Sequence, residues 1–507
     1  MGGRNFSWKD AALRPEMEIA SPAWNAAFEP QVGAPGFEPG RTLVKHIVAI
    51  TCGGVSFVHR IKMLDNAAER ADAVLAELAE VYARSPQPMG AHAREALALA
   101  RSLAFVLARG YHVAAGQPLD DAAPGTKRKI APLLLKAMRY VAEVMRASYK
   151  TYSRLPEGAW KQMHQLYLDA EREGVAMGVA DARSGTSVME LYCESLLLSL
   201  VDPYRLESGE IDRIEALVRE LHAPATVSKE RPETRPTCQF LIPTDDDLPP
   251  RPFREGDSAA GPAARVLDTA ALVESLRALL RVQDGRAALV AKLVSLWDDP
   301  PKRVFRRDAA EGSVAICVGV KPIAHFVAHE AGIDGESEQR ALREGLTMPL
   351  RSLPEDESGQ AIPIHEWAVI NVSAGGVRVR RSALTAYPIT IGEVVGIRAP
   401  GKVLWRIGVT RWVTGLEDGT TEFGVQFFAN AVCAVWVKHA QPTSARRLAL
   451  LVAEDEGGAQ ELLLTPSDTY AEGAEFELRG EGFRSRVRAD GLIEGNTHFQ
   501  LFRVTPA

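Results

Sequence analysis

The hydrophobic period of this chain changes at Pro300, and this change constrains the fold more than any other feature. Before Pro300, apolar residues recur at the i, i+3 and i+4 spacing of amphipathic helices, as in the segment AAERADAVLAELAEVYARS that begins at Ala67. After Pro300, short segments such as SVAICVGV, EWAVINV and GVRVRR alternate apolar and polar residues between Gly-rich turns, which is typical of strands. The sequence therefore predicts a multidomain α + β protein with an all-α N-terminal part and an all-β C-terminal part.

The helical pattern covers residues 62–222 and predicts one all-α domain of several amphipathic helices. Residues 1–61 contain several prolines and glycines and predict a loose N-terminal arm. Within this arm, the apolar run LVKHIVAI at 43–50 predicts a short strand.

The segment 223–268 is rich in Pro, Asp and Arg and is interpreted as a linker. It contains one island with a strand-like sequence, CQFLIP at 238–243, which could dock onto either neighbour. Residues 269–299 carry two further helical patterns and predict a helical connector between the linker and the strand-rich part.

The strand-rich part divides into two regions. Residues 300–440 hold a series of short strands, and this spacing predicts a closed antiparallel barrel or a sandwich. A polar, acidic stretch at about 330–362 is expected to be an insertion between the first two strands. Residues 441–507 repeat the alternating pattern and predict a small C-terminal all-β unit.

Charge and hydropathy narrow the function classes. The net charge of −6 and the pI near 6.1 argue against a DNA or RNA partner, because nucleic-acid binders usually carry a basic excess. No run reaches the roughly 18 apolar residues of a membrane span, and the N-terminus has no apolar signal region. The five cysteines form no C-x-x-C pair, as expected in a reducing compartment. We therefore expect a cytoplasmic protein in which any anionic ligand is met by a local basic cluster.

Known catalytic and metal-binding motifs narrow the function classes further. The sequence contains no nucleophile elbow, no Walker loop, no G-x-G-x-x-G and no GGDEF, EAL or HD-GYP signature. His325 and His329 have helical spacing, but their segment HFVAHE reads as a strand end, so they are interpreted as core or solvated residues. We expect no enzyme activity, no catalytic residue, no metal and no cofactor.

The first distinctive motif is a basic segment directly before the first predicted strand. Four of its six residues are cationic: Lys302, Arg303, Arg306 and Arg307. Such side chains can neutralise phosphates, and arginine can also pair with the O6 and N7 atoms of guanine or stack on its ring.

The second motif joins the end of one predicted strand to the start of the next. It places Asn371 and Ser373 beside Gly375 and Gly376. The amide and the hydroxyl can bind a base edge or cap a turn, and the glycines permit a close approach of the backbone to a ligand.

Together and in this order, the two motifs resemble those of PilZ domains, which have an R-x-x-x-R loop followed by [D/N]-x-S-x-x-G. Arg303 and Arg307 match the first pattern, and Asn371, Ser373 and Gly376 match the second. The later segments GVTRWV and EFGVQFF are also similar to PilZ strands. The resemblance covers about 140 residues, and it implies a six-stranded antiparallel β-barrel.

The resemblance also implies the ligand, the bacterial second messenger cyclic di-GMP. If the matching positions have the same roles as in PilZ domains, Arg303 and Arg307 would clamp its phosphates and guanines. Asn371, Ser373 and Gly376 would then shape the base pocket. Further candidate ligand-binding residues are Lys302, Arg306 and Gly375.

The helical half is similar to the N-terminal helical regions of large proteobacterial PilZ proteins, which assigns it no chemistry. The implied function is a receptor that transmits ligand binding to a downstream protein partner. The alternative is a ligand-independent scaffold, which the insertion at 330–362 favours. A homodimer and the ligand stoichiometry stay open at this point.

Overall fold

The computed structural model describes most of the chain from Phe37 to Ala507. The described ranges are 37–117, 130–181, 184–221, 225–230, 237–253, residue 257, 264–281, 285–300, 306–330, 362–381, 388–402, 405–429, 432–440, 446–453, 461–480 and 483–507. The chain divides into two compact units, Met1–Lys302 with Gly415–Glu417 and Arg303–Thr414 with Asp418–Ala507.

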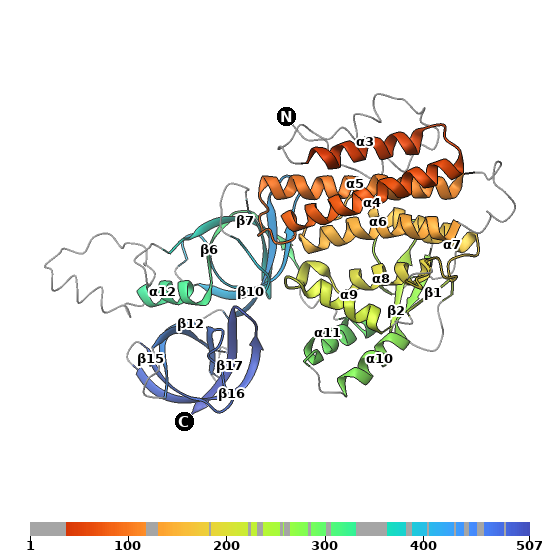
Figure 1. Cartoon of the computed structure of the whole chain (residues 1–507). Coiled ribbons are helices and arrows are strands. Elements are labelled where there is room, and N and C mark those ends of the chain that lie inside the picture. Colours follow the sequence, from red (N-terminus) through yellow and green to blue (C-terminus); the bar gives the residue numbers. More distant parts are fainter. Residues whose placement is uncertain are drawn as a thin grey trace. The chain divides into compact units, whose positions relative to one another are not determined.

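The first unit is built around a bundle of amphipathic helices, coloured red to yellow in Figure 1. The long α5 packs along both α4 and α6, and the alanine-rich face of α5 lets these helices approach closely. This confirms the predicted all-α N-terminal part. The helices are α3 (Glu38–Cys52), α4 (Phe57–Tyr82), α5 (Ala91–Gly116), α6 (Ile130–Lys150), α7 (Ala159–Arg172), α8 (Val188–Leu200), the short 3-10 helix η2 (Pro203–Arg205) and α9 (Glu210–Glu220).

The strand predicted at 43–50 is wrong, because these residues lie within helix α3. Val44, Ile47 and Val48 are buried at helical spacing and form one stripe. At Gly40 the helix also approaches Leu99 of α5 closely. Tertiary packing therefore overrides the local strand preference of the β-branched residues.

The interpretation of 223–268 as a linker is also wrong for its described residues. Four short antiparallel strands form a sheet in the order β1-β4-β2-β3, and Phe240, Ile242 and Leu267 join the core of the helical bundle. The strand-like island therefore docks onto the helical side. The strands are β1 (Thr226–Ser228), β2 (Gln239–Pro243), β3 (Arg251–Pro252) and β4 (Ala264–Asp268), followed by α10 (Ala270–Leu280) and α11 (Ala287–Asp298).

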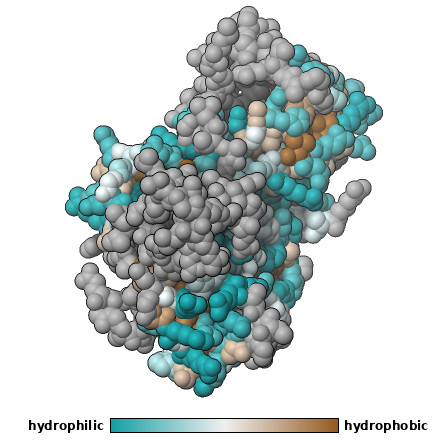
Figure 2. All heavy atoms as spheres, turned by 90° about the vertical axis from the view of Figure 1, so that its left-hand side faces the viewer, coloured by the Kyte–Doolittle hydropathy of each residue, from teal (hydrophilic) through white to brown (hydrophobic). Residues whose placement is uncertain are grey.

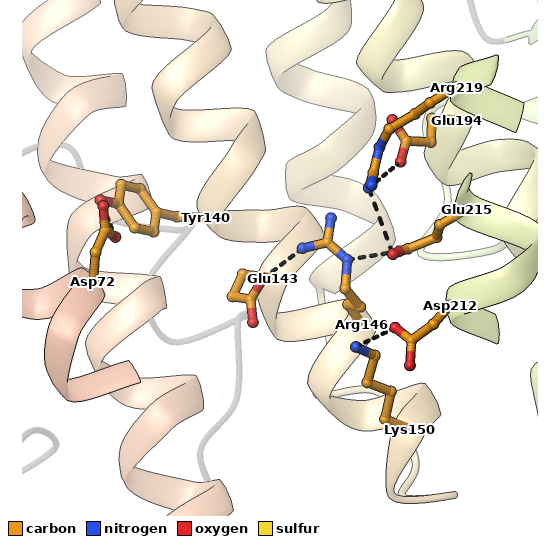
Figure 3. Close-up of polar contacts among 9 residues, drawn as sticks. All are labelled: Asp72, Tyr140, Glu143, Arg146, Lys150, Glu194, Asp212, Glu215 and Arg219. Carbon is orange, nitrogen blue, oxygen red and sulfur yellow. Dashed lines mark hydrogen bonds and ion pairs between the residues drawn. The ribbon is translucent and has the colours of Figure 1, made fainter. Parts of the chain in front are cut away.

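An ion-pair network joins three of the bundle helices (Figure 3). Arg146 of α6 contacts Glu143 at 2.5 Å and Glu215 of α9 at 2.6 Å. Arg219 of α9 reaches Glu194 of α8 at 2.9 Å. The Glu215 side chain is only 6% exposed, so its ion pair with Arg146 is buried between α6 and α9. This network therefore fixes how the two helices pack, which an exposed surface ion pair would not do.

The second unit begins with the predicted barrel. Six antiparallel strands follow one another in the ring β6-β9-β10-β11-β8-β7, and the pairing of β7 with both β6 and β8 closes it. The structure thus confirms the six-stranded antiparallel barrel. The elements are β5 (Asp308–Ala309), β6 (Ser313–Val318), α12 (Val320–Glu330), β7 (His365–Ser373), β8 (Gly376–Arg381), β9 (Val394–Arg398), β10 (Arg406–Gly415) and β11 (Thr421–Ala429).

A second closed barrel follows, in the order β12-β13-β14-β17-β16-β15. Its interior is apolar and includes Val435, Leu463, Phe476 and Phe502. The predicted small all-β unit is therefore a barrel, and it starts earlier than 441 because β12 pairs with β13 and β15. Its strands are β12 (Val432–His439), β13 (Arg447–Ala453), β14 (Glu461–Pro466), β15 (Glu475–Gly480), β16 (Phe483–Gly495) and β17 (Phe499–Pro506).

Helix α12 connects the two barrels through one core (Figure 1). Ile323 and Phe326 are buried with Trp405 of the first barrel and with Leu450 and Phe499 of the second. The segment HFVAHE, interpreted above as a strand end, is therefore wrong as a strand and lies in this helix. Its apolar residues recur at helical spacing, and the shared core stabilises that conformation.

Within the described residues, no helix is both long and apolar enough to cross a membrane. The same residues hold no group of three or more His, Cys, Asp or Glu side chains that could bind a metal ion. The described cysteines are free thiols. The exposed face seen in Figure 2 is largely hydrophilic where its residues are described, with small apolar areas between.

Candidate ligand-binding site

Strand β7 carries the second motif and changes register just before it. Ala368 and Val369 pair with Arg380 and Val379, but the next pair is Asn371 with Arg378, so Ile370 forms a bulge. Bulges re-aim the side chains that follow them. Since directly opposed residues share a face of a sheet, Asn371 lies on the outer face of the barrel with Arg378, opposite in direction to the buried Val379.

The basic segment leads directly into β5, which pairs with this part of β7. Ala309 pairs with Asn371, and Asp308 pairs with Val372. Continuing this antiparallel register by one residue places Arg307 opposite Ser373, and strand alternation puts it on the same face as Ala309 and Asn371. The two motifs, more than 60 residues apart in the sequence, therefore meet along two paired strands.

The turn between β7 and β8 is held by short polar contacts. The Ser373 hydroxyl donates to the carbonyl oxygen of Gly376 at 3.3 Å. A guanidinium N–H of Arg406 donates to the carbonyl oxygen of Ala374 at 3.4 Å, and this guanidinium lies 3.7 Å from the ring centroid of Phe427. The burial of Arg406 lowers its pKa. These contacts hold the motif's backbone in place before any ligand is present.

Gly376 has a packing role that the sequence does not reveal. Its φ is not in the left-handed region, but a Cβ at this position would collide with the backbone oxygen of Val425 in the neighbouring β11. Only glycine allows β8 and β11 to approach this closely. The motif's last residue is therefore explained by strand packing, beside its expected part in shaping the pocket.

Two arginines of β8 extend the site on the outer face. Arg378 and Arg380 both bind the carboxylate of Glu422 on β11, with Nε to oxygen distances of 3.1 and 2.7 Å. The Arg378 guanidinium also lies 5.6 Å from the ring centroid of Trp412. The Glu422 side chain is only 1% exposed, so the two arginines enclose it. Burial alone would raise the pKa of Glu422, but the hydrogen bonds and charges of Arg378 and Arg380 hold it below its usual value.

The lowered pKa of Glu422 predicts that the stability of the fold depends on pH. Because the pKa of Glu422 is lower in the folded state, its contribution is present above the unfolded-state pKa of about 4.3 and is lost as the pH falls through the folded-state pKa. Glu422→Gln should lower the free energy of unfolding at pH 7 by about 1–2 kcal/mol, a value reduced because both arginines are partly exposed. Denaturant unfolding at pH 7 and at pH 3.5 would measure this.

The matched control is Glu366→Gln, which removes an exposed carboxylate on β7. It should leave stability unchanged at both pH values. An equal loss for Glu422→Gln at both pH values would show that its charge contributes nothing.

The structure places part of the predicted site. Asn371, Ser373, Gly375 and Gly376 lie together at the β7–β8 turn. Arg306 is 92% exposed and contacts Asp308 at 3.6 Å. Arg307 is exposed as well and immediately precedes β5. Lys302 and Arg303 lie outside the described residues, as does the insertion apart from Glu330 and Ile362.

Sequence reasoning missed the arginines of β8 and β10. The signal for β8 was present, because the segment GVRVRR alternates and therefore places Arg378 and Arg380 on one face. Trp412 of β10 is half-buried with the Arg378 guanidinium over its ring, whereas Trp405 is buried.

Two family models match the chain. The model of the N-terminal domain of the cyclic-di-GMP receptor FimW matches residues 34–233, and the model of the middle PilZ domain of the same receptor matches residues 336–433. The second match contains β7 to β11 with Asn371, Ser373 and Gly376, but it begins after the basic segment and β6.

A full-length comparison agrees with both models. The cyclic-di-GMP receptor FimW of Pseudomonas aeruginosa is 22% identical over 521 aligned positions, which cover 89% of this chain and 84% of that protein. The helical N-terminal part and the PilZ barrel occur in the same order as in the receptor. The resemblance drawn from the two motifs is thereby confirmed: the chain combines a helical N-terminal domain and a PilZ domain similar to those of the cyclic-di-GMP receptor FimW.

Proposed function

We propose that this chain is a cyclic di-GMP receptor and that the ligand binds on the outer face of the first barrel, across β5, β7 and β8. One observation carries this proposal. The pairing of Ala309 with Asn371 brings the basic segment alongside the N-x-S-x-x-G motif. A loop that starts there can cross the same face as Asn371 and Ser373.

The local charge supports a ligand with two phosphates. Arg307, Arg378 and Arg380 lie on this face, and Glu422 binds the last two of them, while the adjacent Arg306 contacts Asp308. The chain as a whole carries a net charge of −6, so this basic cluster departs from the overall balance. Arginines bind phosphate oxygens bidentately, which suits a cyclic dinucleotide.

The neutral groups support recognition of guanine. Asn371 and Ser373 are half-buried, and their amide and hydroxyl can pair with a base edge. Guanine presents O6 and N7 as acceptors for arginine, and a guanidinium can also stack on its ring. We therefore assign Arg303, Arg307, Asn371, Ser373 and Gly376 as ligand-binding residues, with Lys302, Arg306 and Gly375 beside them.

We further infer that binding is reported to a protein partner in the cytoplasm, without turnover of the ligand. The second barrel is linked to the site within the same unit. Gln426, which pairs with Gly376, accepts a hydrogen bond from Arg411 at 2.8 Å, and Arg411 binds Glu494 of β16 through two contacts of 2.6 and 2.8 Å. A shift of β8 on ligand binding would therefore act on the second barrel through three side chains.

A ligand-independent scaffold remains the second candidate, and one observation favours it. Ser373 and Arg378 already have partners among the residues of the first barrel itself, the Gly376 carbonyl oxygen and the Glu422 carboxylate. If these contacts persist, the face is complete without a ligand.

Titration calorimetry of the full chain distinguishes the two functions. We expect saturable heat with cyclic di-GMP and binding of cyclic di-AMP that is weaker by about tenfold or more, because one bidentate guanine contact discriminates by roughly 1–3 kcal/mol. The absence of heat with cyclic di-GMP would support the scaffold instead. Equal affinity for both dinucleotides would contradict the assigned guanine contacts.

A further inference from the structure

The outer face of the second barrel carries an unusual set of arginines, and neither family model covers most of it. Along β16, Val487 and Ala489 point into the barrel. Strand alternation therefore directs Arg484, Arg486 and Arg488 outward, and all three are exposed.

The neighbouring strands extend this face. Arg479 of β15 pairs with Arg484, and Glu477 pairs with Arg486. Lys438 of β12 pairs in turn with Glu477. We call this set the arginine face. It comprises Lys438, Arg479, Arg484, Arg486 and Arg488, with Glu475 and Glu477 among them.

The arginine face is not neutralised by its own carboxylates. Five cations stand against two carboxylates, which leaves a net charge of +3. Glu477 binds Arg484, and Glu475 contacts Arg488 at 3.2 Å. Arg479 lies directly opposite Arg484, an arrangement of like charges that destabilises a sheet. Within the described residues, no ion pair is formed by Arg479 or Arg486.

An exposed aromatic ring ends the same hairpin. Phe483 is 39% exposed, and its ring lies against the backbone of Gly480, where any Cβ would collide with it. By strand alternation, the Phe483 ring lies on the side of the sheet opposite to Arg484, so the arginine face itself is formed by charged side chains.

We propose that the arginine face binds an acidic, extended segment of a partner protein. Residues two apart on a strand are about 6.8 Å apart, so alternate carboxylates of an extended peptide have the same spacing as Arg484, Arg486 and Arg488. The planar guanidinium fork matches a carboxylate bidentately. Glu475 and Glu477 interrupt the cations, which disfavours a continuous array of phosphates as in nucleic acid or an anionic membrane. This proposal does not depend on ligand binding at the first barrel.

Fluorescence anisotropy with the full chain tests the proposal. The probe is a labelled twelve-residue peptide of alternating Glu and Thr, and its control alternates Gln and Thr. We expect binding of the Glu peptide alone, weakened by added salt. Arg479→Gln with Arg486→Gln should weaken it by about tenfold or more, because two charge-assisted contacts are lost.

These two arginines are chosen because neither forms an ion pair in the described part of the chain, so the fold should tolerate their replacement. An unchanged melting temperature would verify this. The matched control is Arg70→Gln with Arg84→Gln, which removes the same charge from exposed positions in the first unit and should leave binding unchanged. Failure of the Glu peptide to bind, or equal weakening by both double variants, would overturn the proposal. So would tighter binding of double-stranded DNA or phosphatidylglycerol vesicles that the Arg479 and Arg486 replacements abolish.

Discussion

Replacing Arg307 with alanine is expected to weaken cyclic di-GMP binding by about tenfold or more, because a hydrogen bond to a charged group contributes roughly 1.5–3 kcal/mol. Arg307 immediately precedes β5, whose register with β7 puts it opposite Ser373 on the face that holds Asn371. Replacing Arg303 as well should abolish measurable binding, since both matched arginines of the R-x-x-x-R motif are then lost. Titration calorimetry with cyclic di-GMP measures both effects.

The neighbouring Arg306 provides the control. Arg306→Ala removes the same charge one residue away, from a side chain that is 92% exposed and that strand alternation directs to the other face. It should weaken binding much less than Arg307→Ala. If both replacements had equal effects, the contribution would come from the general charge of the segment, and the assignment of Arg307 to the binding face would be contradicted.

Gly376→Ala is expected to have the largest effect on stability, a loss of about 3 kcal/mol, at the upper end of what overpacking costs. The added Cβ would meet the backbone oxygen of Val425, which cannot rotate away as a side chain could. The strands β8 and β11 would have to separate, and their ladder includes the pairing of Gly376 with Gln426. Denaturant unfolding of the full chain, followed by a probe of β-structure, measures the loss.

Gly495→Ala serves as the control for this replacement. Gly495 also lies in a strand of the second unit, but a Cβ there would meet Leu492 at 3.4 Å, an ordinary contact distance. It should change stability by less than about 1 kcal/mol. Equal stability of the Gly376→Ala variant and the unmodified protein would mean that β8 and β11 have room to part.

The sequence predicts the architecture well wherever apolar residues keep the same spacing, helical or alternating, over a whole segment. The helices of the first half and the six strands of the first barrel follow from periodicity, because amphipathic spacing records which face is buried. Prediction from the spacing of apolar residues fails at 43–50 and at HFVAHE, because these short apolar runs are compatible with a strand as well as with a helix. There the packing of α3 on α5, and of α12 on both barrels, decides the conformation.

The candidate site was predictable in its motifs but not in its surroundings. Asn371, Ser373 and Gly376 are adjacent in sequence, so a local pattern identifies them. Glu422 joins the site only through the register of β11 with β8, which no local pattern contains. The bulge at Ile370 is equally invisible, although it decides which residues of β7 face outward.

The shared core around α12 has a consequence for how such a chain can evolve. Ile323 and Phe326 contact apolar residues of both barrels, so neither barrel covers that helix alone. Recombination that added or removed the second barrel would have to rebuild this core at the same time. We therefore expect related proteins to contain both barrels together, even where the barrel sequences differ between them.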